Sequence, residues 1–238
     1  MYGWRARIGL IIPSSNTTNE SEFAGMLPSG VSLHTSRMYL TDNQADELEK
    51  MADDAERCAK LLATADVDVL AYGCTTGSLV KGPGYDEEIE QRLEESTGIV
   101  SVATAASVKR AFDELGVGRV AIATPYEQEL DERERRFLED GGYDVAEIRG
   151  LGIRQNTEVG AEPPMTSYRQ AYDLFRSADG EVDAIFISCT NYRTFETIPL
   201  LEQDTGVPVV TSNQATLWDA LRRANVSTTS LNLGRLFE

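Results

Sequence analysis

The stretch Asp66-Val-Asp-Val-Leu-Ala-Tyr-Gly-Cys74-Thr75 returns later in the chain as Glu181-Val-Asp-Ala-Ile-Phe-Ile-Ser-Cys189-Thr190. Two further pairs repeat in the same order, residues 7–13 with 119–125 and residues 98–104 with 206–212. The offsets are 112 from 7 to 119, 115 from 74 to 189, and 108 from 98 to 206. Self-similarity at a nearly constant spacing indicates an internal duplication. The 238 residues therefore predict two related halves.

Each repeated run is short, apolar and bounded by Gly, Pro or Asp, which is typical of a strand buried on both faces. Helical segments lie between these runs. Over Asp46–Ala63 apolar residues return every three or four positions, and Cys58 falls on this stripe, which predicts a core residue. Strands that alternate with helices predict right-handed crossovers. The expected fold class is α/β, with two pseudosymmetric halves, each a mainly parallel four-stranded sheet flanked by helices.

A helix is expected after the last strand of each half, and the positions of these two helices indicate how the halves are joined. One is expected over Ala105–Leu115 and the other over Gln214–Ala224. We expect the two halves to exchange these closing elements. The first predicted domain then comprises residues 1–104 plus 213–238, and the second comprises residues 105–212. Ligands in such sheets gather beyond the carboxyl ends of the strands, so the site is expected in the cleft between the halves.

The charge of the chain excludes some partners. A net charge of −17 arises from 39 acidic and 22 basic residues, and only four of the basic residues are lysine. Such a surface repels nucleic acid and anionic lipid, and its composition resembles the acidic proteins of salt-in halophiles. The apolar run before Pro13 is too short for an export signal or a membrane span. We expect a cytoplasmic protein whose three cysteines are free thiols.

Cys74 and Cys189 occupy equivalent positions, each after a buried strand and before a turn that contains threonine. Backbone N–H groups at such a turn favour a thiolate, so we predict lowered pKa values for both thiols. Under pseudo-twofold symmetry the sulfurs face each other and can act on two faces of one carbon or one double bond. The competing interpretation is that each cysteine is a small buried hydrophobe.

A metal site is not expected, because neither cysteine has a second ligand at metal spacing and His34 is the only histidine. His34 lies in a predicted strand, Val31–Tyr39, where a structural role is expected. No cofactor is predicted.

Neutral hydrogen-bond donors lie at the other predicted loops. Asn16, Tyr126 and Asn156 can each bind a carboxylate without neutralising it. Asn16 is equally suited to cap a helix, and Asn156 to form a turn. The remaining candidate substrate-binding residues are the other polar side chains at the strand ends, namely Ser14, Thr75, Thr76, Thr190 and Asn191.

Six motifs together resemble the maleate cis-trans isomerase family, within the aspartate/glutamate racemase and arylmalonate decarboxylase superfamily. They are Pro13-Ser-Ser-Asn16 with Glu20, Cys74-Thr-Thr-Gly-Ser78, Thr124-Pro-Tyr126, Gly152-Ile-Arg-Gln-Asn156, Ser188-Cys-Thr-Asn191 and Ser212-Asn-Gln-Ala215. The resemblance covers about residues 7 to 220. It implies an isomerase that converts maleate, a small dicarboxylate, into fumarate without a cofactor. The exposed faces of such folds often pair, which is compatible with a homodimer or higher homo-oligomer, but the sequence does not fix the oligomeric state.

The resemblance also implies a role for each site residue. Cys74 would be the nucleophile that forms a succinyl thioether, and Cys189 its acid/base partner. Asn16, Tyr126 and Asn156 would hold the carboxylates. Three alternatives stay open: a racemase of the aspartate/glutamate type, an arylmalonate-type decarboxylase using the same cleft, and a non-catalytic anion sensor or thiol switch. The cysteine at position 74 argues against the decarboxylase, and the asparagine pattern fits a dicarboxylate better than an amino acid.

Overall fold

The computed structural model describes residues 2–40, 47–48, 51, 54–229 and 231–238. The elements up to the fourth strand are β1 (Ala6–Pro13), α1 (Asn19–Met26), β2 (Val31–Met38), α3 (Ala55–Ala63), β3 (Val69–Tyr72), α4 (Thr75–Leu79), α5 (Tyr85–Thr97) and β4 (Ser101–Ala103). The later elements are α6 (Thr104–Leu115), β5 (Arg119–Thr124), α7 (Gln128–Asp140), β6 (Asp144–Gly150), α8 (Asn156–Ala161), α9 (Pro164–Ser177), β7 (Ala184–Ile187), α10 (Ile198–Thr205), β8 (Val209–Thr211), α11 (Ser212–Arg223) and the short helix η1 (Arg235–Phe237).

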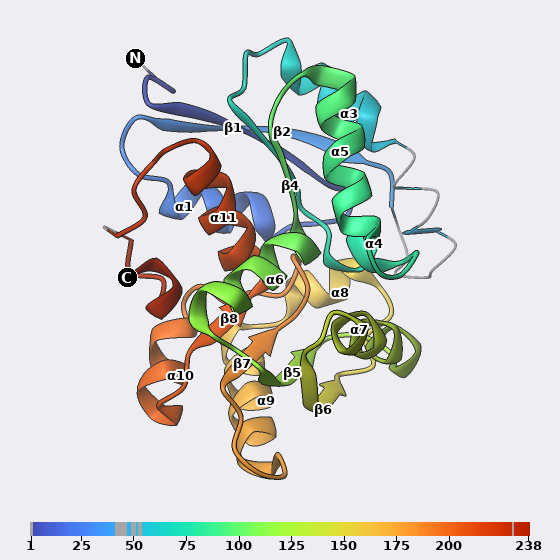
Figure 1. Ribbon diagram of the computed structural model, residues 1–238, viewed down its shortest axis with the longest axis vertical. Helices are drawn as coiled ribbons and strands as arrows, with labels where there is room; N and C mark the ends of the chain where they lie inside the picture. The colour runs from blue at the N-terminus through green and yellow to red at the C-terminus, as the bar shows by residue number, and fades with distance from the viewer. Residues whose placement is uncertain (1, 41–46, 49–50, 52–53, 230) are drawn as a thin grey trace.

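The strands form two four-stranded sheets with equivalent strand orders. The first has the order β2-β1-β3-β4 and the second β6-β5-β7-β8. Every pairing within each sheet is parallel. The sheets lie in the upper and lower parts of the molecule in Figure 1. The predicted fold class, two related α/β halves, is confirmed.

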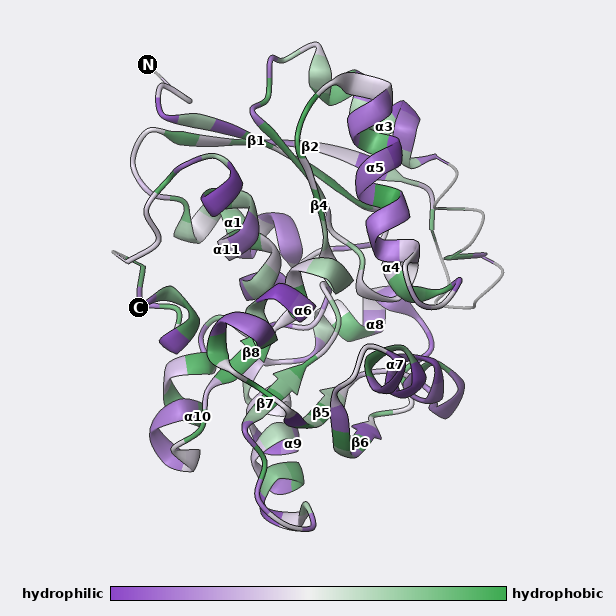
Figure 2. Cartoon of the chain, viewed as in Figure 1, coloured by the Kyte–Doolittle hydropathy of each residue, from purple (hydrophilic) through white to green (hydrophobic). Residues whose placement is uncertain are grey.

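The central strands are buried on both faces, as their apolar runs predicted. All four residues of β3 and all four of β7 are buried. The outer helices α5 and α7 are mostly hydrophilic in Figure 2, whereas the central strands β5 and β7 of the second sheet are mostly hydrophobic. A parallel sheet covered by helices on both faces gives this distribution.

Cys58 lies in the core, as predicted. It is fully buried in α3, and its Sγ hydrogen-bonds to the carbonyl of Arg37 at 3.4 Å. The helix predicted over Asp46–Ala63 is interrupted by a turn at Asp54, and α3 begins after it at Ala55. Leu48 and Met51 of the predicted stripe are helical and buried. The rest of that prediction, on residues 46, 49–50 and 52–53, lies outside the described residues.

The two closing helices pack against each other between the sheets. Helix α11 also contacts β3 and β4 of the first sheet, and α6 contacts β8 of the second. Each helix therefore touches the sheet of the other half as well as the strand that precedes it. The division into residues 1–104 plus 213–238 and 105–212 stays a prediction. None of the helices within the described ranges has the length and apolar character needed to span a membrane.

Candidate active site

Cys74 lies at the turn between β3 and α4. Its backbone is extended, and its Sγ accepts a hydrogen bond of 3.3 Å from the N–H of Gly77. A Cβ on Gly77 would lie 3.0 Å from this sulfur and 2.7 Å from the Tyr72 hydroxyl. A glycine at position 77 therefore lets the backbone approach the sulfur closely. The Tyr72 hydroxyl is buried and has no hydrogen-bond partner in the described part of the chain.

Cys189 lies at the equivalent turn after β7. Its φ of 91° places it in the left-handed region, which residues other than glycine rarely adopt. The N–H of Asn191 donates to its Sγ at 3.4 Å, and the buried side chain of Tyr126 lies near this sulfur. Strained backbone of this kind clusters at functional sites.

The predicted lowering of the two thiol pKa values is wrong. Burial raises the pKa of Cys74 to about 11 and that of Cys189 to about 12. The two side chains are only 4% and 6% exposed. The backbone N–H groups are present, as the turns predicted, and they do favour the thiolates. Desolvation of a charged sulfur outweighs them, so both residues rest as thiols at neutral pH.

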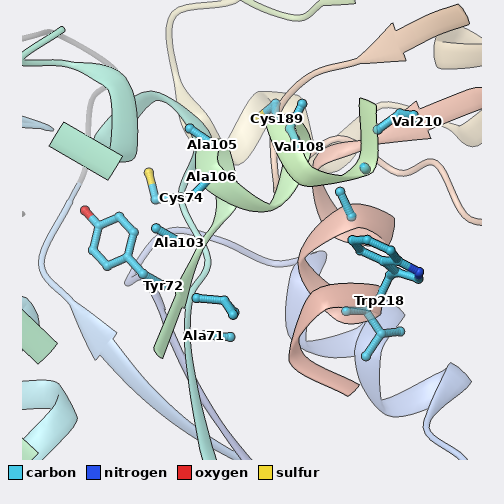
Figure 3. Close-up of a cluster of buried hydrophobic side chains, with 14 of the residues drawn as sticks. Ala71, Tyr72, Cys74, Ala103, Ala105, Ala106, Val108, Cys189, Val210 and Trp218 are labelled. Carbon is cyan, nitrogen blue, oxygen red and sulfur yellow. The ribbon is translucent and has the colours of Figure 1, made fainter. Parts of the chain in front are cut away.

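The residues next to the two cysteines meet at the junction of the halves. Ser212, the first residue of α11, has its Oγ 2.8 Å from Thr75 Oγ1 and 3.1 Å from the backbone N of Cys189. Thr190 Oγ1 donates to the carbonyl of Gly73 at 3.1 Å. Both cysteines belong to one cluster of buried side chains, drawn in Figure 3. The two turns that carry the cysteines therefore meet at the junction of the halves.

Two of the predicted amide side chains also reach this junction. Asn16 Nδ2 donates to Thr190 Oγ1 at 3.1 Å, while its Oδ1 accepts the N–H groups of Thr18 and Asn19 at the start of α1. Asn191 Nδ2 donates to the carbonyl of Asn156 at 2.6 Å. Asn16 thus links the two halves and also accepts the free backbone N–H groups at the start of α1.

Asn156, the first residue of α8, donates from Nδ2 to Ser15 Oγ at 2.9 Å. Ser14 does not join the group: it is exposed, and its hydroxyl bonds to the carbonyl of Leu40 at 3.2 Å. Thr76, by contrast, lies beside Cys74, with its Oγ1 3.9 Å from Cys74 Sγ.

Sequence reasoning missed Ser212 as a site residue. It had appeared only within a family motif, although its hydroxyl contacts the neighbours of both cysteines. The signal that could have found it is the repeat itself, because Ser212 aligns with Thr104 at the start of the other closing helix. Thr104 likewise donates its hydroxyl inward, to the carbonyl of Tyr72 at 2.9 Å.

Two helical glycines give a matched test of how tightly this junction is packed. A Cβ on Gly160 in α8 would lie 2.2 Å from Thr17 Oγ1 and 3.0 Å from both amide atoms of Asn191. A Cβ on Gly25 in α1 would meet nothing within 4 Å. We expect Gly160→Ala to destabilise the fold by about 1–3 kcal/mol through overpacking. Gly25→Ala should instead stabilise it by up to about 1 kcal/mol through helix propensity.

Urea denaturation of the two glycine variants and the wild type checks this expectation. Equal stabilities for the two variants would contradict the close packing of α8 against residues 17 and 191.

The described residues contain no group of three or more His, Cys, Asp or Glu side chains arranged to hold a metal ion. The polar groups around the thiols are neutral amides and hydroxyls. Neutral donors of this kind can bind an anion through hydrogen bonds.

Comparison with known proteins identifies the family. A family model described as arylmalonate decarboxylase matches residues 8–237. The maleate isomerase of Geobacillus stearothermophilus is 31% identical over 97% of this chain and 96% of its own length. The solved structure of the Pseudomonas putida S16 maleate isomerase with maleate has a TM-score of 0.91 and 30% identity, and the match covers 98% of this chain and 97% of that one.

A further solved structure is a cysteine-to-serine mutant of the Nocardia farcinica maleate cis-trans isomerase with a covalently bound succinylcysteine intermediate. Its TM-score is 0.91 at 29% identity, and the match covers 98% of each chain. The chain therefore belongs to the arylmalonate decarboxylase family, and within it is an isomerase of the maleate isomerase type.

Proposed function

We propose that this protein converts maleate, or a closely related cis-enedioate, into the trans isomer without a cofactor, through a succinyl thioether on Cys74. The observation that carries the proposal is the hydroxyl of Ser212, which bonds to Thr75 beside one cysteine and to the backbone of the other. Two thiols from different halves thereby share one junction. The named activities of the relatives and the succinylcysteine in one of them support the same chemistry.

The chemistry removes the barrier that a double bond sets against rotation. The Cys74 thiol first releases its proton to solvent and takes one back at the end of the cycle. Its thiolate adds to C2 of maleate, which forms a C–S bond and breaks the C2–C3 π bond. The electron pair delocalises into the carboxylate on C3 as an enediolate, and C3 then takes the proton of the Cys189 thiol. After rotation about the C2–C3 single bond, the Cys189 thiolate removes a proton from C3. The electron pair re-forms the double bond, and sulfur leaves as the Cys74 thiolate.

The neutral side chains around the thiols would hold the two carboxylates. Asn16, Asn156 and Tyr126 are buried at this junction, and all three can donate hydrogen bonds. Donors in a site that excludes water stabilise a developing enediolate more strongly than they would in bulk water. These donors would hold the diacid in one orientation without neutralising its two negative charges. Thr75, Thr76, Thr190 and Asn191 would supply the remaining hydroxyl and amide contacts.

Proton NMR of maleate incubated with the protein tests the proposal, because maleate and fumarate each give one distinct vinyl signal. We expect the fumarate signal to grow at the expense of the maleate signal with no added cofactor. Release of carbon dioxide from an arylmalonate, or deuterium wash-in at the α-carbon of aspartate, would assign one of the alternative activities. A rise in melting temperature with maleate but no turnover would indicate a sensor.

A further inference from the structure

A buried hydroxyl group lies beside the Cys74 sulfur. Tyr72 is fully buried, and its hydroxyl has no hydrogen-bond partner within the described ranges. A Cβ on Gly77 would lie 2.7 Å from this hydroxyl and 3.0 Å from the sulfur, so the two atoms cannot be further apart than the sum of these distances. In Figure 3 the two side chains point to the same side of the chain. The nucleophile of the proposed reaction therefore has an unused hydrogen-bond donor next to it.

The end of strand β3 explains this placement. Tyr72 is the last residue of β3, and the backbone of Cys74 is still extended, with φ −150° and ψ 112°. Side chains two residues apart on extended backbone point to the same face. The intervening Gly73 faces the other way, where a Cβ would meet side chains of β1 and α1. The order Tyr-Gly-Cys thus sets a phenol and a thiol side by side.

A buried hydroxyl without a partner destabilises a fold. Water satisfies the tyrosine hydroxyl in the unfolded chain, and burial without a partner forfeits that hydrogen bond. Phenylalanine would fill nearly the same space without this cost. The polar atom of Tyr72 therefore calls for an explanation beyond packing.

The missing partner is present once Cys74 ionises. A thiol sulfur is a weak acceptor, whereas a thiolate accepts strong, charge-assisted hydrogen bonds. Among the described residues, the N–H of Gly77 and the hydroxyl of Thr76 contact the sulfur. These two contacts do not offset burial, which raises the pKa of Cys74 to about 11. A third donor would lower the free energy needed to form the thiolate.

We propose, building on the proposed function, that Tyr72 is a catalytic residue whose hydroxyl donates a hydrogen bond to the Cys74 sulfur when the thiolate forms, before addition to C2 and after departure from it. The phenol keeps its own proton throughout, so the proton of the thiol still goes to solvent. Formation of the C–S bond removes the charge from sulfur and releases the hydrogen bond. Because the resting residue is a thiol, stabilising the thiolate lowers the energy needed to reach the addition step.

The first test compares stability with turnover in Tyr72→Phe. Removal of an unpartnered hydroxyl should raise the melting temperature by about 2–4 °C. Loss of the hydrogen bond to the thiolate should lower kcat for maleate about tenfold. A fall in melting temperature would show that the hydroxyl has a partner in the resting fold, and an unchanged kcat would show that the sulfur does not use it. Either result would overturn the proposal.

Tyr85→Phe is the matched control. The hydroxyl of Tyr85, at the start of α5, is also buried without a partner in the described part of the chain. It is not among the three atoms nearest to a Cβ on Gly77, which belong to Tyr72, Met51 and Cys74. We expect the same rise in melting temperature, with kcat within about twofold of the wild type. An equal loss of turnover in both variants would indicate a general effect of packing and would refute a contact to the sulfur.

A second test does not use maleate and so separates this inference from the proposed function. In a Cys58→Ser/Cys189→Ser background Cys74 is the only cysteine left, and the rate at which iodoacetamide alkylates it at pH 8 reports its thiolate. Adding Tyr72→Phe should lower this rate about three- to tenfold, whereas adding Tyr85→Phe should leave it unchanged.

An alkylation rate that Tyr72→Phe leaves unchanged, together with a raised KM for maleate, would assign the hydroxyl to the substrate instead of the sulfur and overturn the proposal. If the wild type does not convert maleate, the proposed function fails, and the alkylation rates still decide the role of Tyr72.

Discussion

Replacing Cys74 with serine is expected to lower maleate turnover by at least about a thousandfold, because a serine hydroxyl is a far weaker nucleophile than a thiolate. The fold should persist, since the side chain lies at a strand end and its partners are the N–H of Gly77 and the hydroxyl of Thr76. Steady-state turnover and circular dichroism measure the two effects. Mass spectrometry after brief contact with maleate should find a diacid adduct in Cys189→Ser and none in Cys74→Ser.

Cys58→Ser is the matched control for the Cys74 prediction. Its sulfur is fully buried in α3 and bonds only within the first half, to the carbonyl of Arg37 at 3.4 Å. We expect this variant to lose stability and to keep its turnover. A well-folded Cys58→Ser without turnover, beside a fully active Cys74→Ser, would refute the assignment of the nucleophile.

The second large effect is expected at Glu22, which ties α1 to the second half. Its carboxyl group accepts the N–H groups of Thr194 at 2.7 Å and Phe195 at 3.0 Å, and the amide of Asn213 at 2.6 Å. Glu22→Ala leaves the N–H groups of Thr194 and Phe195 without a partner, and the Asn213 amide keeps only its bond to the carbonyl of Thr190. We therefore expect the free energy of unfolding to fall by roughly 3 kcal/mol. Glu20→Ala, which removes a surface ion pair with Arg37, should cost less than about 1 kcal/mol.

The Glu22 effect should also depend on pH. Burial raises the pKa of Glu22 from 4.5 to about 7, so the folded state holds this proton more tightly than the unfolded state. The stability from the raised pKa is fully present below pH 4.5 and is lost as the pH rises through about 7. Urea denaturation at pH 5 and pH 8 should therefore show a larger difference between wild type and Glu22→Ala at pH 5. A difference that grows with pH would contradict the raised pKa.

The sequence was sufficient to predict the two sheets, because buried parallel strands are continuous apolar runs and the repeat gave their correspondence. It also predicted the closing helices closely: the expected Ala105–Leu115 and Gln214–Ala224 correspond to α6 (Thr104–Leu115) and α11 (Ser212–Arg223). The break at Asp54 was not predictable, since the apolar spacing continues across it. Such spacing reports which face is buried and not where the backbone turns.

The site was less predictable, because its details depend on contacts between distant segments. Ser14 and Ser15 are adjacent and chemically identical, yet only Ser15 faces Asn156. The thiol pKa values were mispredicted because a strand-end motif reveals the local N–H groups, whereas the burial that dominates depends on how the whole chain packs. The contact between the buried Glu134 and the hydroxyl of Ser188 could not be predicted either, because 54 residues separate the two in the sequence.

Helices α6 and α11 each pack against the sheet of the other half, so the chain cannot be divided between the halves without separating packed elements. A break in the chain between Leu115 and Arg119 would leave α6 on one fragment and its neighbours β8 and α11 on the other. Each fragment would expose an apolar helix face that only the missing piece can cover. Neither half should be an autonomous folding unit, and two separately expressed fragments should gain order only when they are mixed.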